Sequence, residues 1–536
     1  MKIYKFGVIL LALVYLTGLQ GCNDGSVKKK YYPGLIGAYY GNADLTNIKY
    51  PEILHSLDDV WDEETGHGSS WSGKYTGYII SPHTGDIKFT MMTDQRATIV
   101  ISESISMELD NIIPEKTLNV TAVKNEKIPL TVIYMHSEKR PGRLNISWEW
   151  EGSPKATVPD SLLVYDSEQA VYFNWLPEPE FDEVDFSVFG KVKSKNRVVY
   201  YEEGRFAGWP ANNGIWSWGD EIVVGFSLGY FLENPLHHSI DENRGSDAVL
   251  ARSTDGGETW NFEGRWSGKI SKPESGRVNF AHPGLAVRCT SDGFYVSYDR
   301  AAKWQGPFLF PDFGYKKITT RTDYIPLSKD ECLFFLSYED KSVMARLEDK
   351  VFAVITRDGG QTFERLGNIC PDDKYRAVMP SSVKINNGHI VTALRRRYDQ
   401  PFGYDRPMLS KNWIDAYESK DNGMSWTFLS KVADTDMGKN NGNPPSMIKL
   451  DDGRLVVTYG YRAVPYSIRA RISSDNGRTW SEEIILRSDC REFDAGYTRT
   501  VQRKDGLIVT VYYIPTAERY EQHIEATIWD ADSIYE

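Results

Sequence analysis

An eight-residue pattern that recurs in the second two thirds of the chain constrains the fold more than any other sequence feature. The pattern, Ser-x-Asp-x-Gly-x-Thr-Trp, occurs at Ser253–Trp260, Thr356–Phe363, Ser419–Trp426 and Ser473–Trp480, with a degenerate copy at Ser297–Trp304. Asp and Gly favour a tight hairpin, and the hydroxyl and carboxylate oxygens can accept hydrogen bonds from turn amides. The copies, called Asp boxes below, begin 44 to 63 residues apart. That spacing suits one four-stranded blade of a β-propeller with its loops.

A second repeat, a two-residue turn followed by an apolar strand, is independent of the first. Its six turns are Gly219-Asp220, Asp292-Gly293, Lys329-Asp330, Asn387-Gly388, Asp452-Gly453 and Asp505-Gly506. Six copies predict six blades, with Phe186–Tyr201 supplying a strand that closes the ring. We therefore predict a six-bladed propeller over residues 187–536.

Composition favours an all-β protein and argues against several partners. Aromatic residues make up 13% of the 536 residues, and 44 Gly and 25 Pro favour short strands and tight turns. The net charge of −12 argues against nucleic acid as a partner. The four cysteines beyond residue 22 are too scattered for a disulfide framework or a CxxC metal site. We expect no metal and no cofactor.

The first 22 residues predict export and anchoring. Lys2 and Lys5 precede an apolar run from Phe6 to Leu16, and Leu19-Gln20-Gly21-Cys22 follows. The segment resembles the signals of bacterial lipoproteins. The resemblance implies a signal peptide over 1–21, lipidation of Cys22 and a tether over 22–31. The protein would then be a cell-envelope lipoprotein that faces the periplasm or the cell surface, attached to the membrane by its lipid.

Residues 32–165 contain short alternating strands, which predict a first all-β domain ahead of the propeller. The stretches Gly34–Tyr40, Trp71–Ile79 and Leu144–Trp150 resemble the carbohydrate-binding β-sandwich first described in anthrax protective antigen. The resemblance implies a sugar-binding domain or a structural spacer. Calcium-dependent members carry adjacent acidic residues where this chain has Asp94-Gln95, which argues against a metal-dependent sugar site. Residues 166–186 predict a stiff, polar linker.

Residues 187–536 resemble the sialidase superfamily, the Asp-box propellers of glycoside hydrolase family 33 and its relatives. The resemblance implies three arginines that clamp a substrate carboxylate, an aspartate as general acid/base, and a tyrosine, assisted by a glutamate, that attacks the anomeric carbon. Three arginines suit this role because each guanidinium group can pair bidentately with a carboxylate. A neutral tyrosine also avoids repulsion between an attacking carboxylate and an acidic sugar.

The arginines that match lie on separate blades. Arg205 lies in Gly204–Pro210 at the start of the first blade, with two extra residues between it and the proline of the family motif. Arg395 follows the Asn387-Gly388 turn by the usual interval, with Arg397 on the same strand face as the alternative. Arg462 ends the fifth-blade strand.

The remaining site residues are assigned on the same resemblance. Tyr497 starts the strand before Asp505-Gly506, where the family has its nucleophile. Asp241 best matches the acid/base, and Asp247 is its competitor. His237 and His238 share the loop of Asp241; without a third spaced ligand they are interpreted as substrate-facing or exposed.

One departure concerns the glutamate that should assist the tyrosine. Met379-Pro380-Ser381 occupies the expected position. Either Glu492, Asp494 or Asp323 serves from a neighbouring strand end, or the chemistry differs from that of an ordinary sialidase.

The sequence as a whole predicts a glycoside hydrolase that releases terminal sialic acid or another acidic sugar from glycans. Two alternatives stay open: an exo-glycosidase or lyase of the same fold with a different glycan substrate, and a noncatalytic surface protein that binds glycans.

Overall fold

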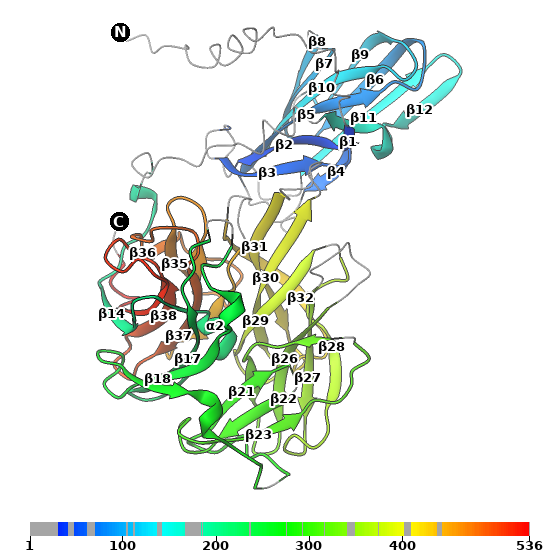
Figure 1. The fold of residues 1–536 in the computed structure, drawn as a ribbon. Helices are drawn as coiled ribbons and strands as arrows, with labels where there is room; N and C mark the ends of the chain where they lie inside the picture. Colours follow the sequence, from blue (N-terminus) through cyan, green and yellow to red (C-terminus); the bar gives the residue numbers. More distant parts are fainter. Residues whose placement is uncertain are drawn as a thin grey trace.

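The computed structural model describes residues 31–40, 45, 48–61, 70–102, 105–110, 113–136, 142–166, 184, 186–234, 237–274, 276–291, 293–315, 317–339, 349–373, 375–400, 409–436 and 442–534. The predicted signal peptide, Cys22 and nearly all of the tether lie outside these ranges, as does most of the linker. The all-β prediction is confirmed, because strands dominate the described chain (Figure 1). In these ranges no helix is both long and apolar enough to cross a membrane.

Two antiparallel sheets form the N-terminal unit. The first contains β1 (Tyr31–Pro33), β2 (Leu35–Tyr40), β3 (Ile48–Leu54), β5 (Trp71–Ile80), β7 (Arg96–Ile101), β8 (Ile105–Leu109), β10 (Lys127–His136) and β13 (Leu163–Asp166). The second contains β4 (Asp58–Trp61), β6 (Gly85–Thr93), β9 (Glu115–Ala122), β11 (Gly142–Trp150) and β12 (Ser153–Thr157), and the short 3-10 helix η2 (Asp160–Leu162) leads from it into β13.

The two N-terminal sheets pack face to face. Along β10 every second side chain is buried, which is the period of a strand with one face on a core. Tyr75 and Val132 of the first sheet and Phe89 and Ile146 of the second belong to one buried cluster. The unit therefore has its own hydrophobic core.

Six further sheets follow along the chain. Their strands are β15 (Arg205–Gly208), β16 (Ile215–Trp218), β17 (Glu221–Tyr230), β18 (Asp247–Ser253) and β19 (Asn261–Arg265); β20 (Ile270–Ser271), β21 (Ala286–Thr290), β22 (Gly293–Ser297) and β23 (Trp304–Leu309); β24 (Ile318–Thr319), β25 (Tyr324–Pro326), β26 (Cys332–Glu339), β27 (Asp349–Thr356) and β28 (Glu364–Asn368); β29 (Arg376–Lys384), β30 (Ile390–Gln400), β31 (Leu409–Ser419) and β32 (Thr427–Asp434); β33 (Ser446–Lys449), β34 (Leu455–Tyr461), β35 (Ser467–Ser473) and β36 (Ile484–Arg487); and β14 (Ser194–Tyr200), β37 (Gly496–Gln502), β38 (Ile508–Ile514) and β39 (His523–Trp529). The short helices are η4 (Phe186–Val188), α2 (Pro210–Asn213), η5 (Glu242–Arg244) and η6 (Trp266–Lys269).

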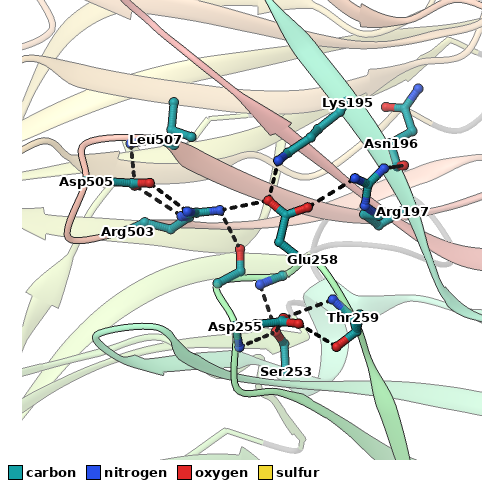
Figure 2. Close-up of polar contacts among 12 residues, drawn as sticks. Lys195, Asn196, Arg197, Ser253, Asp255, Glu258, Thr259, Arg503, Asp505 and Leu507 are labelled. Carbon is teal, nitrogen blue, oxygen red and sulfur yellow. Dashed lines mark hydrogen bonds and ion pairs between the residues drawn. The ribbon is translucent and has the colours of Figure 1, made fainter.

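The last sheet joins the two ends of the C-terminal unit. β14, which begins the unit, pairs antiparallel with β39, which ends it. Figure 2 shows a second connection, in which the carboxylate of Glu258 in the first Asp box lies among cations of the last sheet. Lys195 of β14 reaches it, as do Arg197 at 3.1 Å and Arg503 at 3.4 Å. Arg503 also donates to the carbonyl of Gly256 at 3.2 Å.

The Asp boxes form hairpin turns between neighbouring strands, as their pattern predicts. In the first box, Ser253 Oγ accepts from Gly257 N at 2.7 Å and Asp255 Oδ1 accepts from Thr259 N at 2.9 Å. The same two bonds recur in the other four boxes. Each box thus satisfies turn amides that would otherwise need water.

We expect the C-terminal unit to fold without the N-terminal one. A chain that begins at Phe186 keeps β14 and the whole last sheet, and each unit has hydrophobic clusters of its own. Described contacts between the units include β3 near β31 and the Lys431 ammonium 5.9 Å from the Tyr39 ring centroid. The matched control begins at Glu202 and lacks β14. The first chain should be monodisperse with a single thermal transition and the second should aggregate; aggregation of both would show that the N-terminal unit belongs to the folding core.

Candidate active site

Tyr497 lies at the start of β37 in a backbone conformation that bulky residues rarely adopt. Its φ is 49°, in the left-handed region, which costs roughly 1–2 kcal/mol for an L-residue. Asn443 holds this segment, since its Oδ1 accepts from Tyr497 N at 2.8 Å and its Nδ2 donates to Ala495 O at 3.2 Å. A Cβ at Gly496 would lie 2.3 Å from Asn443 Oδ1, so the position requires glycine. Backbone strain that the surroundings enforce is typical of functional sites.

Two of the predicted arginines lie beside this tyrosine. Arg395 of β30 places Nη1 3.5 Å from the Tyr497 hydroxyl. Arg462, directly after β34, places its guanidinium carbon 5.5 Å from the ring centroid. The site lies at the strand ends opposite to the Asp boxes, because β37 runs from Tyr497 to the turn at Arg503, and that turn contacts the first box.

The charges around Tyr497 change its acidity. Its side chain is 8% exposed, and burial alone raises the pKa of a phenol. The positive charges of Arg395, His238, Arg462 and Arg321 outweigh burial and lower the pKa of Tyr497 to about 7. Near neutral pH a substantial fraction of this side chain is therefore a phenolate, a better nucleophile or base than an ordinary tyrosine.

Arg395 is a buried cation without a carboxylate partner in the described part of the chain. It is 4% exposed, and its Nε has no hydrogen-bond partner there. Burial lowers the pKa of Arg395 to about 10; Tyr497 opposes this effect, and Arg376, Arg397 and Arg462 add to it. A protein that keeps such a charge carries a desolvation cost, which a bound anion would offset.

Arg462 differs because it is well paired. Its Nη2 donates to the Tyr513 hydroxyl at 2.6 Å and to Ala495 O at 3.3 Å, and it lies 3.5 Å from Asp494 Oδ1. The guanidinium is 1% exposed. This arginine therefore fixes the strand end before Tyr497 as well as adding positive charge to the site.

Asp494 is the buried anion of the cluster, and it contacts His238 rather than Tyr497. Its Oδ1 lies 2.6 Å from His238 Nδ1 and accepts from the Tyr513 hydroxyl at 2.5 Å. Burial opposes its charge, but His238, Arg462 and Tyr513 together hold the pKa of Asp494 below its usual range. An ionised carboxylate with these partners orients the histidine and does not deprotonate the tyrosine directly.

Three other predicted residues have the following contacts and exposure. Arg205 donates its Nε to Gly229 O at 2.6 Å and stacks on the Tyr230 ring at 4.5 Å. Arg397 lies opposite Arg376 in the β29–β30 register. His237 is exposed.

The carboxylates considered for acid, base or assisting roles have other partners. Asp241 caps η5 by accepting from Asn243 N at 3.1 Å. Its competitor Asp247 pairs with Arg265 at 2.9 Å. Glu492 accepts from Gln522 at 2.8 Å, and burial raises its pKa.

Met379 occupies the position where the resemblance implies a glutamate. It is buried in the same apolar cluster as Tyr497, and its φ of 58° is also left-handed. Apolar surface therefore replaces the expected carboxylate next to the tyrosine. The acidity of Tyr497 comes from cations, not from a neighbouring base.

Asp323 belongs to a separate cavity of about 480 Å³, whose lining also includes Ser382 and Arg499 but not Tyr497. Ser382 Oγ donates to Asp323 Oδ2 at 2.7 Å. Burial raises the pKa of Asp323 to about 7.

Three residues near Tyr497 were not predicted from the sequence. Arg321 precedes β25 and lies close enough to lower the pKa of Tyr497. Tyr513 and Asn443 fix Asp494 and the Tyr497 backbone. The sequence offers one indication for Arg321, its position just before a strand, but no motif distinguishes it from the other arginines. Among the described residues, no group of three or more His, Cys, Asp or Glu side chains is placed to hold a metal ion.

Comparison with known proteins gives a family and several distant structures. Residues 235–511, more than half of the chain, match the BNR repeat-like domain family. Among curated proteins none matches. A solved structure of unknown function from Dyadobacter fermentans is 20% identical, covers 63% of this chain and 99% of its own, and has a TM-score of 0.46. The NanB sialidase from Streptococcus pneumoniae is 11% identical over 90% of this chain and 98% of its own, with a TM-score of 0.42. An α-L-arabinofuranosidase from Fusarium graminearum is 12% identical over 63% of this chain and 97% of its own, with a TM-score of 0.36.

Proposed function

The chain belongs to the BNR repeat-like domain family, and we propose that it is a glycoside hydrolase that releases a terminal acidic sugar, with sialic acid as the first candidate. The observation that carries the proposal is the buried Arg395, which has no carboxylate partner in the described ranges and lies beside Tyr497. A substrate carboxylate would supply the missing anion and would bring its sugar to the tyrosine.

The proposed roles follow from the charges of the site. Arg395 and Arg462 orient the carboxylate, and Arg321 takes the place that sequence analysis gave Arg205. Tyr497 attacks the anomeric carbon as a phenolate, not as the neutral tyrosine expected from the sequence, and the positive charges of Arg395 and Arg462 offset its repulsion from the substrate carboxylate. An assisting base is then not required, so Met379 can lie where a carboxylate was expected. The proposal includes closure of the six C-terminal sheets into a propeller, supported by the pairing of β14 with β39.

Release of 4-methylumbelliferone from its α-sialoside tests the activity, followed by other acidic glycosides and native glycans. Mass spectrometry of the released sugar separates the two reactions, because hydrolysis adds one water to the sugar, whereas a lyase gives an unsaturated sugar that is lighter by one water. The unsaturated product would contradict hydrolysis. Binding without turnover by the intact protein would favour a glycan-binding protein.

The pH dependence of kcat/KM should follow the acidity of Tyr497. Because the phenolate is the active form, kcat/KM on the umbelliferyl sialoside, whose leaving group needs little protonation, should rise with pH through about 7, where the free enzyme loses this proton. Arg395 is the largest of the charges that lower the pKa of Tyr497, so Arg395→Met should move this limb to higher pH. An unmoved limb in Arg395→Met would assign the titration to another group.

The N-terminal segments extend the proposal. We propose lipidation at Cys22 and attachment to the cell envelope, supported by the signal-like sequence that precedes it. The face-to-face sheets over residues 31–166 would hold the catalytic unit away from the membrane or bind glycan near it.

A further inference from the structure

The contacts of Asp494 define the state of the neighbouring His238. Besides His238 and Tyr513, the carboxylate accepts from the backbone N–H of Ser239, which donates to Oδ2 at 3.2 Å. Asp494 is 0% exposed and therefore cannot turn toward water. An anion fixed in this way acts on the reaction only through the groups that it contacts.

The short contact with Asp494 assigns the proton of the neutral His238 ring to Nδ1. Trp209 Nε1 also lies 3.4 Å from the same nitrogen, but Nδ1 cannot donate to Asp494 and accept from Trp209 at once. The bond of 2.6 Å to an ionised carboxylate is the stronger of the two. The Trp209 contact is therefore packing, consistent with the edge-to-face rings 5.0 Å apart. Nε2 is the nitrogen left for proton exchange.

His238 is also placed to serve the Tyr497 site. Its ring lies edge-to-face against that of Tyr497, with centroids 6.2 Å apart. Its side chain is 28% exposed, whereas Asp494 is buried. Of this pair, the histidine is thus the member that a substrate can reach.

We propose that His238, oriented by Asp494, is the general acid and base of the reaction, the role that sequence analysis gave Asp241. The inference rests on the proposed function and deepens it. Asp241 is already used as the cap of η5, and its competitor Asp247 pairs with Arg265. Asp494 is a positioning residue in this scheme.

The proton balance closes with one histidine and one tyrosine. The reacting enzyme holds His238 as the imidazolium ion, with its Nδ1 proton donated to Asp494. In the first step the Tyr497 phenolate forms a bond to the anomeric carbon, the glycosidic C–O bond breaks, and the leaving oxygen takes the Nε2 proton, which leaves a neutral ring protonated at Nδ1. In the second step water attacks the anomeric carbon, gives a proton to Nε2, and displaces the phenolate. The products are a free sugar and an alcohol, and the enzyme regains its starting state.

Leaving-group dependence tests this role. Sialyllactose has an alcohol leaving group that needs protonation, and 4-methylumbelliferyl sialoside has a phenol that needs little. His238→Ala should lower kcat by about 1000-fold on sialyllactose and by about tenfold or less on the umbelliferyl substrate. Asp494→Asn should show the same selectivity with a smaller loss, because it permits the wrong tautomer.

Asp241→Asn is the matched control and should change both rates by less than about threefold. If Asp241→Asn shows the selective loss and His238→Ala does not, the inference is wrong while the proposed function stands. If the wild-type protein cleaves neither sialoside nor any other acidic glycoside, the proposed function fails, and with it the role of His238 in that reaction.

A spectroscopic measurement tests the orientation without substrate. In the intact protein labelled with ¹⁵N-histidine, the His238 signal, assigned by its loss in His238→Ala, should show the neutral ring protonated at Nδ1. Asp494→Asn should move the proton to Nε2 in part of the population. A neutral ring protonated at Nε2 in the wild-type protein would overturn the inference, even if Asp494→Asn fails to fold.

Discussion

Tyr497→Phe is expected to lower turnover by at least about 1000-fold and to leave the fold unchanged. The substitution removes the only atom of this side chain that can form a bond to the sugar, and loss of a nucleophile is not compensated by its neighbours. Stability should stay within about 1 kcal/mol, because among the described residues the Tyr497 hydroxyl has one weak contact, with Arg395 at 3.5 Å. Single-turnover assays and thermal melts of the purified variants measure both effects.

Tyr513→Phe is the matched control for this result. Tyr513 lies in the same cluster, with its ring centroid 5.9 Å from that of Tyr497, but its hydroxyl bonds Asp494 and Arg462. We expect a loss of about tenfold with some loss of stability, since a buried carboxylate loses one donor. Near-normal activity of a folded Tyr497→Phe would exclude the tyrosine as nucleophile.

The parts of the fold that repeat were predictable because their causes are local. The Ser, Asp and Gly of an Asp box interact within eight residues, so the turn at Ser253–Trp260 follows from its own sequence. The apolar strand after each turn is equally local. The pairing of β14 with β39 was expected from the count of turns, since one strand was needed to complete the last sheet.

The residues of the candidate site were predictable only where their position along a strand decides whether they reach it. Arg462 and Tyr497 lie at strand ends and Arg395 lies within β30, and the three residues come from three different sheets. Arg205 also begins a strand, but its guanidinium donates to Gly229 O within its own sheet. Its direction depends on side-chain packing, which no spacing rule supplies. Arg321 lacks a motif, so only its placement in space reveals it.

The pairing of Asp494 was beyond the sequence for a different reason. Asp494 lies three residues before Tyr497, which made it a reasonable candidate for the assisting base. Its carboxylate is instead surrounded by donors from a distant loop and from β38, among them Ser239 and Tyr513. Contacts between segments more than 200 residues apart depend on the assembled sheets.

Arg395→Met and Arg462→Met should give opposite effects on stability and similar effects on activity. Arg395 is buried without a carboxylate partner in the described residues, so methionine of similar length should raise the free energy of unfolding by about 1–3 kcal/mol below the pKa of Tyr497, where the tyrosine is neutral. Arg462 bonds Tyr513 and lies beside Asp494, so its loss leaves a buried carboxylate undercompensated and should cost about 3–5 kcal/mol. Both variants should lower kcat/KM on an acidic substrate by at least about 100-fold.

Denaturant titration and steady-state kinetics separate the two cases. If the charge of Arg395 serves to bind the substrate carboxylate, Arg395→Met should gain stability and lose activity. Arg462→Lys keeps the positive charge but not the planar fork, so it should recover part of the stability and little of the activity. If Arg395→Met is strongly destabilised instead, this arginine has a structural anion partner, and the case for an acidic substrate loses its main support.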